Sequence, residues 1–209
     1  VDDSLIAIMT DRKICPYFDL PFQHSHPHVL RLMRRGFSGR QALKLISKIR
    51  KKIPEAVFRT SLIVGFPGEG QKEFQNLLDF VREAEFDHLG VFIYSQEKGT
   101  PAYSLGDPIS FEEKKRRKDT IMQLQAEISR KKLSRFVGQK LEVLLDGSSN
   151  PQKTIYYGRS RYQAPEVDGI VKVSGGQANK PLSPGITMVE ITGYGRYDLR
   201  GIIIDENFN

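Results

Sequence analysis

The hydrophobic pattern of the first 110 residues changes period several times, and this limits the possible folds more than any other feature. Residues 14–20, 57–64 and 87–94 are short, β-branched or aromatic, and bounded by glycine or proline, which is typical of buried parallel strands. Between them, apolar residues recur with a period of about 3.6 over 42–53 and 74–84, as in amphipathic helices. The alternation predicts an α/β fold built on a parallel sheet.

Local signals indicate where the predicted helices begin and end. Ser38 is a suitable N-cap for the first helix, and Pro54 ends it. The second helix follows a Gly-Phe-Pro-Gly turn, and Val29, Leu32 and Met33 predict a shorter helix before Gly36.

Three strands make an incomplete sheet. A closed barrel of this type needs about eight strands, and an open sheet this small leaves its edges bare. We therefore expect further strands upstream, and a chain that begins with Val1 rather than Met is interpreted as a processed or cloned piece.

The second half of the sequence has a different pattern. Residues 111–135 predict a long basic helix with a sparse apolar stripe, interpreted either as a solvated connector or as a helix that contacts an anionic partner. From residue 136 onward, five short strands separated by Gly, Pro and Asn turns predict a small OB-like barrel; they are 140–145, 154–161, 168–173, 186–193 and 196–204. The predicted domains are 1–110, 111–135 as the connecting helix, and 136–209.

Charge and composition narrow the class of protein. The net charge is +7, but it divides into +2 for residues 1–110, +5 for 111–135 and zero for 136–209, so a committed RNA-binding barrel is disfavoured. No apolar run reaches the roughly 20 residues of a membrane span, and the acidic N-terminus is unlike a signal peptide. We expect a cytoplasmic protein without membrane contact. The single Cys15 excludes an internal disulfide and any site that needs three or four cysteines of this chain.

Three of the four histidines lie close together. His24, His26 and His28 are spaced by two residues, so a metal site, and with it a zinc hydrolase, is one hypothesis. Such a barrel site needs ligands from several strand ends, and the remaining His88 falls at the beginning of its strand. The favoured interpretation is that His26 and His28 are surface residues that start a helix, with no metal bound.

The ends of the predicted strands are polar and rich in glycine. The second strand breaks into Gly65-Phe66-Pro67-Gly68-Glu69, and the third ends in Tyr94-Ser95-Gln96-Glu97. Glycine at a strand end lets a ligand approach the backbone closely. The alternative is a tight strand-to-helix connection with Glu69 in the first helical turn.

Several motifs together resemble one family. Asp-Leu-Pro-Phe-Gln-His (19–24), Val-Leu-Arg-Leu-Met-Arg-Arg (29–35), Arg-Thr-Ser-Leu-Ile-Val-Gly-Phe-Pro-Gly-Glu (59–69), Phe-Asp-His-Leu-Gly-Val-Phe-Ile-Tyr-Ser (86–95) and Glu-Lys-Gly-Thr-Pro-Ala (97–102) resemble the second half of a radical S-adenosylmethionine methylthiotransferase. The C-terminal barrel resembles the TRAM domain of that family. The resemblance covers nearly the whole chain and implies the C-terminal half of a partial TIM-like barrel, made of three β/α units, followed by TRAM.

Two branches of the family compete. His24 directly after Gln23, the run 164–169 and Tyr197-Asp198-Leu199 resemble the branch that methylthiolates an aspartate of small-subunit ribosomal protein S-twelve. The other branch modifies tRNA adenosine and usually has Gln-Ser-Gly after the first strand. The neutral barrel favours a protein substrate, with ribosomal or transfer RNA as a further contact.

The resemblance also implies cofactors and site residues. The family uses S-adenosylmethionine and two 4Fe–4S clusters, whose cysteine ligands would lie outside this chain, so the chain alone is predicted to be inactive. The residues expected near S-adenosylmethionine are Gln23, His24, Arg59, Gly65, Phe66, Gly68, Glu69, Tyr94 and Ser95. Arg59 is expected to pair with its methionine carboxylate. An RNA-stacking face on the barrel would consist of Tyr156, Tyr157, Arg159, Arg161 and Tyr162. A stand-alone RNA-binding module remains the alternative of a different class.

Overall fold

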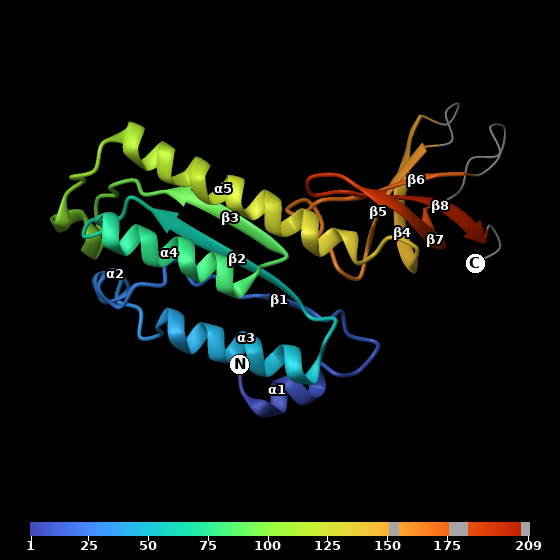
Figure 1. Ribbon diagram of the computed structural model, residues 1–209, viewed down its shortest axis with the longest axis horizontal. Coiled ribbons are helices and arrows are strands. Elements are labelled where there is room, and N and C mark those ends of the chain that lie inside the picture. Colours follow the sequence, from blue (N-terminus) through green and yellow to red (C-terminus); the bar gives the residue numbers. More distant parts are fainter. Residues whose placement is uncertain (151–154, 176–183, 206–209) are drawn as a thin grey trace. The chain divides into compact units, whose positions relative to one another are not determined.

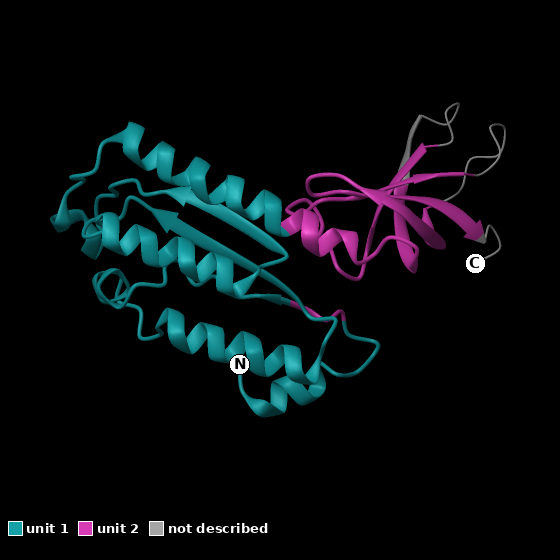
Figure 2. Cartoon of the chain, viewed as in Figure 1, with its two compact units in different colours: residues 1–14, 18–128 teal, residues 15–17, 129–209 magenta. Residues whose placement is uncertain are grey.

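The computed structural model describes residues 1–150, 155–175 and 184–205 (Figure 1). It forms two compact units, residues 1–14 with 18–128 and residues 15–17 with 129–209 (Figure 2). Each unit is built around its own hydrophobic core.

The first part of the chain alternates helices with strands, as the hydrophobic periods predict. The elements are α1 (Asp3–Ile8), β1 (Tyr17–Asp19), α2 (Pro27–Leu32), α3 (Gly39–Lys52), β2 (Val57–Val64), α4 (Gln71–Ala84), β3 (His88–Ile93), the 3₁₀ helix η1 (Pro101–Leu105) and α5 (Phe111–Ser134). The three strands form one sheet in the order β1-β2-β3. The predicted α/β class is confirmed.

The register of the sheet brings the strand ends to one edge. β2 and β3 run parallel, with Arg59 opposite His88 and Val64 opposite Ile93. Beyond β1, Gln23 forms a parallel bridge with Leu62. Because parallel strands end at the same edge, the segments after β1, β2 and β3 lie together there.

Helix α3 shows how local sequence sets an element. Ser38 caps the helix, its side chain accepting a hydrogen bond from the Gln41 backbone, and the Gln41 side chain returns the capping-box contact to the Ser38 backbone. Ala42, Ile46 and Ile49 recur on one face and are buried. Burying an isoleucine stabilises the fold by roughly 1.5–3 kcal/mol, so this face anchors α3 to the unit 1 core.

The two faces of the sheet differ. On β2, Phe58, Leu62 and Val64 are buried in the core that α3, α4 and α5 complete. The alternate residues Arg59, Ser61 and Ile63 are only partly buried. Side chains alternate along a strand, so within the described residues one face of the sheet carries the core and the other is open.

The second unit is a closed barrel, which confirms the predicted OB-like TRAM architecture. Its strands are β4 (Lys140–Asn150), β5 (Ile155–Ser160), β6 (Val171–Ser174), β7 (Gly185–Tyr194) and β8 (Leu199–Asp205), in the barrel order β4-β5-β6-β8-β7. β6 and β8 pair in parallel, and the other pairs are antiparallel. Thr154, in the predicted strand 154–161, lies outside the described residues.

Helix α5 is more than a connector. Residues 111–128 belong to the first unit and the rest of the helix to the second. Ile121 is fully buried, and Gln125 is buried with its side-chain amide donating to the Phe86 carbonyl. The first turns of α5 are thus part of the α/β unit.

No helix within the described ranges is long and apolar enough to cross a membrane.

Candidate active site at the carboxyl ends of the strands

A pocket opens at the edge of the sheet where the strands end. Its volume is about 290 Å³, and most of its lining is apolar. The lining residues are Gln23, Leu32, Met33, Arg34, Arg35, Ile63, Phe66, Thr100, Pro101 and Ala102. Phe66 packs edge-on against Tyr94, with 5.0 Å between ring centroids. A small apolar cavity with few polar groups is the usual form of a ligand site.

The backbone around this pocket is held in an unusual conformation. Gly65 and Gly68 have φ values of 75° and 92°, and Gln23, which is not a glycine, has φ 67°. Such a conformation costs a non-glycine residue about 1–3 kcal/mol. Two backbone hydrogen bonds to β2 hold Gln23 in place, from its amide to Ser61 and from Ile63 to its carbonyl. Among the described residues its carboxamide has no hydrogen-bond partner, so it remains available to a ligand.

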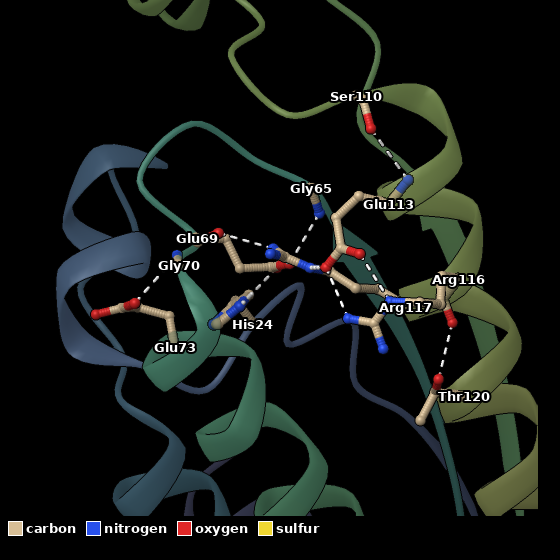
Figure 3. Close-up of polar contacts among 10 residues, drawn as sticks. All are labelled: His24, Gly65, Glu69, Gly70, Glu73, Ser110, Glu113, Arg116, Arg117 and Thr120. Carbon is tan, nitrogen blue, oxygen red and sulfur yellow. Dashed lines mark hydrogen bonds and ion pairs between the residues drawn. The ribbon is translucent and has the colours of Figure 1, made fainter.

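Glu69 is the centre of a buried polar network beside the pocket (Figure 3). Its carboxylate accepts hydrogen bonds from the Gly65 amide at 3.0 Å, Arg117 Nη1 at 2.6 Å and His24 Nε2 at 3.0 Å. Its side chain is fully buried. A buried carboxylate needs such compensation, and here the donors come from the segments after β1 and β2 and from α5. Glu69 thereby joins these three segments.

The hydrogen bonds of His24 define its tautomer and its role. Its Nδ1 accepts from the His26 amide at 3.0 Å, which leaves the proton on Nε2, where it donates to Glu69. The side chain is fully buried. Both ring nitrogens are therefore occupied, and His24 acts as a structural link between the end of β1 and the turn after β2.

Arg117 connects this network to α5. Its Nη1 also donates to the Glu69 carbonyl at 2.7 Å, and its Nε donates to Glu113 at 2.8 Å. Hydrogen bonds from Arg116 and then Arg117 lower the pKa of Glu113 to about 2. The Glu113 carboxyl is therefore ionised at any ordinary pH.

Lys114 connects α5 to the segment after β3. Its Nζ donates to the Tyr94 carbonyl at 3.1 Å and pairs with Asp107. Its methylene groups fill the space where Gly65 would carry a Cβ. Burial raises the pKa of Tyr94, so its phenol stays neutral. Together, Lys114 and Arg117 tie α5 to the segments after β2 and β3, and Glu69 links them through His24 to the segment after β1.

The structure places the predicted site residues in three groups. Gln23 and Phe66 line the pocket, and Tyr94 packs beside it. His24, Gly65 and Glu69 form the buried network, while Gly68 packs against Leu32 and His28.

Two predicted residues lie apart from these groups. The Arg59 guanidinium pairs with Asp19 at 2.7 Å, and six residues of strand, about 20 Å, separate it from Gly65. Ser95 is exposed and donates to Glu97 at 3.1 Å. The structure does not bring Arg59 together with the pocket.

The sequence interpretation missed Glu113, Lys114 and Arg117. The predicted apolar stripe of this helix starts at Ile121, and continuing it backward at helical spacing leads to Arg117 and Lys114. Both are buried, at 6% and 3% exposure. Their positions in the continuation of a buried stripe could have predicted that these cations are buried. A buried cation requires an anionic partner, so a buried ion pair could also have been predicted.

The histidines after β1 have structural roles. His26 is the N-cap of α2, its ring accepting from the His28 amide. This confirms that they start a helix. Within the ranges that the structure describes, no group of three or more His, Cys, Asp or Glu side chains is arranged to hold a metal ion.

The predicted stacking face of the barrel needs one correction. Tyr156 is completely buried and belongs to the barrel core, so its ring has no face open to a base. Tyr157, Arg159 and Arg161 alternate with it and are partly exposed, but Arg159 pairs with Asp146. Tyr162 packs on Phe136, with 5.0 Å between the rings. Neighbouring residues of a strand point to opposite sides. Tyr156 therefore faces the barrel core, while Tyr157 and Arg159 face the other way.

Comparison with known proteins defines the class. Residues 1–81 match the Radical SAM superfamily, and residues 137–204 match the TRAM domain. A solved structure described as coproporphyrinogen III oxidase (HemN) from Escherichia coli, a radical SAM enzyme, superposes with a TM-score of 0.52 at 19% identity, over 61% of this chain and 30% of that one. That likeness shows the fold. The chain thus contains a radical SAM segment followed by a TRAM domain.

Curated relatives are more specific. The chain is 46% identical to ribosomal protein uS12 methylthiotransferase RimO of Aquifex aeolicus and 47% identical to that of Thermosynechococcus vestitus, over 96% of its length in both. It covers 46% and 44% of these relatives, a little under half of their length. The chain is a homologue of the RimO methylthiotransferases, and the family resemblance predicted from its motifs is confirmed.

The residues present do not fit the role of iron–sulfur ligands. Such clusters are held by cysteine thiolates, and the chain has the single Cys15, which is exposed. No cluster is therefore assigned to these residues.

Proposed function

We propose that this chain supplies part of a methylthiotransferase that adds a methylthio group to an aspartate of ribosomal protein uS12. The observation that carries the proposal is the 46% identity to a uS12 methylthiotransferase, which continues through both units. The balance of eight basic and eight acidic residues over 136–209 supports it. A barrel committed to tRNA would need surplus cations for phosphates.

The pocket at the strand ends is the proposed site for S-adenosylmethionine. Its apolar wall at Phe66 and Ile63 suits the adenine ring, and the unpaired Gln23 carboxamide suits the ribose hydroxyls. Gln23, Ile63 and Phe66 would hold S-adenosylmethionine here, and the bound cofactor would supply the radical chemistry of the reaction together with a reduced cluster whose ligands are not in this chain.

The residues of this chain bind and orient the reactants. Glu69, Lys114 and Arg117 hold the strand ends rigid, which keeps the wall of the pocket in one geometry. Arg34 and Arg35 at the rim are exposed, and no carboxylate within the described ranges pairs with them. A positive rim suits the approach of the substrate aspartate. We assign recognition of uS12 to the TRAM barrel.

Mass spectrometry of the products tests this function. The protein extended by its upstream coding region, with reduced clusters and S-adenosylmethionine, is expected to add one methylthio group to the uS12 aspartate. The present chain serves as the control and is expected to give no product, because it lacks cluster ligands. Modification of tRNA in place of uS12 would contradict the choice of substrate.

A further inference from the structure

Helix α3 carries a row of cations on its outer side. Six of its fourteen residues are Lys or Arg, and none is Asp or Glu. Arg40, Lys44, Ser47 and Lys51 recur at intervals of four, three and four residues, which places them on one face of a helix. The opposite face is apolar and buried in the core. The row spans about 16 Å at 1.5 Å per residue.

Three of these cations are not neutralised. Lys48 and Lys52 pair with Asp3, at 2.8 and 3.6 Å. Within the described ranges, Arg40, Lys44 and Lys51 have no ion pair or hydrogen bond from their side chains, and all three are exposed. They line a groove of about 600 Å³ together with Glu83 of α4, the helix that lies beside α3 (Figure 1).

Several cations of α5 form ion pairs within the unit, unlike Arg40, Lys44 and Lys51 of α3, although residues 111–135 carry the largest surplus of positive charge. Lys114, Arg116 and Arg117 are taken up by Asp107, Glu113 and Glu69 within the unit. Counting charges by segment therefore overstates the free positive charge of α5, because these pairs are invisible in the sequence. The uncompensated cationic groove lies on α3.

We propose that the α3 groove binds the phosphate backbone of RNA without reading its sequence. A nucleic-acid strand carries one charge per about 3.4 Å of helix axis, so a row of about 16 Å faces about five phosphates. Lysine is a flexible point charge that suits such contacts. The inference is independent of the proposed function and concerns a surface away from the strand-end pocket.

Other anionic partners fit this surface less well. A membrane-bound helix needs apolar side chains on the face that meets the lipid, and the apolar face of α3 is already buried. A protein interface needs apolar or aromatic anchors, and among the described residues Leu43 is the one apolar residue that lines the groove. A polymer with regularly spaced negative charges, such as RNA, fits this groove best.

Fluorescence anisotropy with a labelled RNA hairpin tests the proposal on the chain as it is. We expect a binding constant whose logarithm falls linearly with the logarithm of the salt concentration. Lys44→Gln/Lys51→Gln should weaken it about tenfold and reduce the salt slope by about 2, one for each phosphate that is no longer neutralised. Lys115→Gln/Lys118→Gln removes the same charge from α5 and should change neither the slope nor the affinity by more than about twofold.

Three results would overturn the proposal. They are the absence of salt-dependent RNA binding, loss of binding in the α5 variant but not in the α3 variant, and equal or tighter binding of polyglutamate or phosphatidylserine vesicles. Circular dichroism spectra of both variants verify that the fold is intact. Methylthio transfer is not part of this readout, so failure here leaves the proposed function standing, and the reverse also holds.

Discussion

Replacing Glu69 by alanine is expected to lower the free energy of unfolding of the first unit by about 3–5 kcal/mol, the usual loss when one partner of a buried ion pair is removed. The variant leaves the Arg117 guanidinium, which is 6% exposed, without its carboxylate. It also removes the acceptor of the Gly65 amide and of the His24 ring. Urea unfolding followed by far-ultraviolet circular dichroism measures the loss, because most helical residues lie in this unit.

A matched control and a double variant sharpen this test. Glu83→Ala removes an exposed carboxylate of α4 and should stay within about 0.5 kcal/mol of the parent. Glu69→Ala/Arg117→Ala removes both charges, so its loss should be smaller than the sum of the single losses by about 1 kcal/mol or more. A Glu69 variant as stable as the Glu83 variant would show that the network does not hold the strand ends.

The second large effect is expected for Gly65→Ala. Gly65 has φ 75°, and an added Cβ would overlap the side chain of Lys114. The left-handed backbone and the overlap together should lower the free energy of unfolding by about 3–4 kcal/mol. Gly99→Ala is the matched control, since Gly99 has φ 82° with nothing within 4 Å of its Cβ position. It should lose about 1–2 kcal/mol from the backbone alone.

The difference between these two glycines isolates the contact with Lys114. In a Lys114→Ala background the overlap is gone, so Gly65→Ala should then lose no more than Gly99→Ala, as measured by the same urea unfolding. If Gly65→Ala is equally costly in both backgrounds, Lys114 does not pack against the turn.

Elements with strong local signals were predictable from the sequence. α3 is an example, because its cap at Ser38, its buried stripe and the proline after it are all encoded within 17 residues of chain. The three strands were predictable in the same way, from short apolar runs bounded by turns. Element boundaries shifted by a few residues, as with β6, which begins at Val171 rather than 168.

The polar network was not predictable because its contacts are long-range. Glu69 and Arg117 are 48 residues apart. The local pattern of α5 indicates that Lys114 and Arg117 continue its buried stripe, but it does not indicate which carboxylates they contact. His24 was expected near the ligand, but its burial depends on Glu69, 45 residues away. Tyr156 depends on which side of β5 faces the barrel interior, and hydrophobicity alone does not settle this for the alternating run Ile155-Tyr156-Tyr157.

Photo-crosslinking with an azido derivative of S-adenosylmethionine tests most directly whether the strand ends form the cofactor site. The derivative is irradiated with the present chain, and the adducts are mapped by peptide mass spectrometry with and without an excess of S-adenosylmethionine. We expect adducts that the excess suppresses, located within residues 23–35, 61–69 or 94–102. Adducts confined to α3 or the barrel, or adducts that excess S-adenosylmethionine does not suppress, would contradict this assignment.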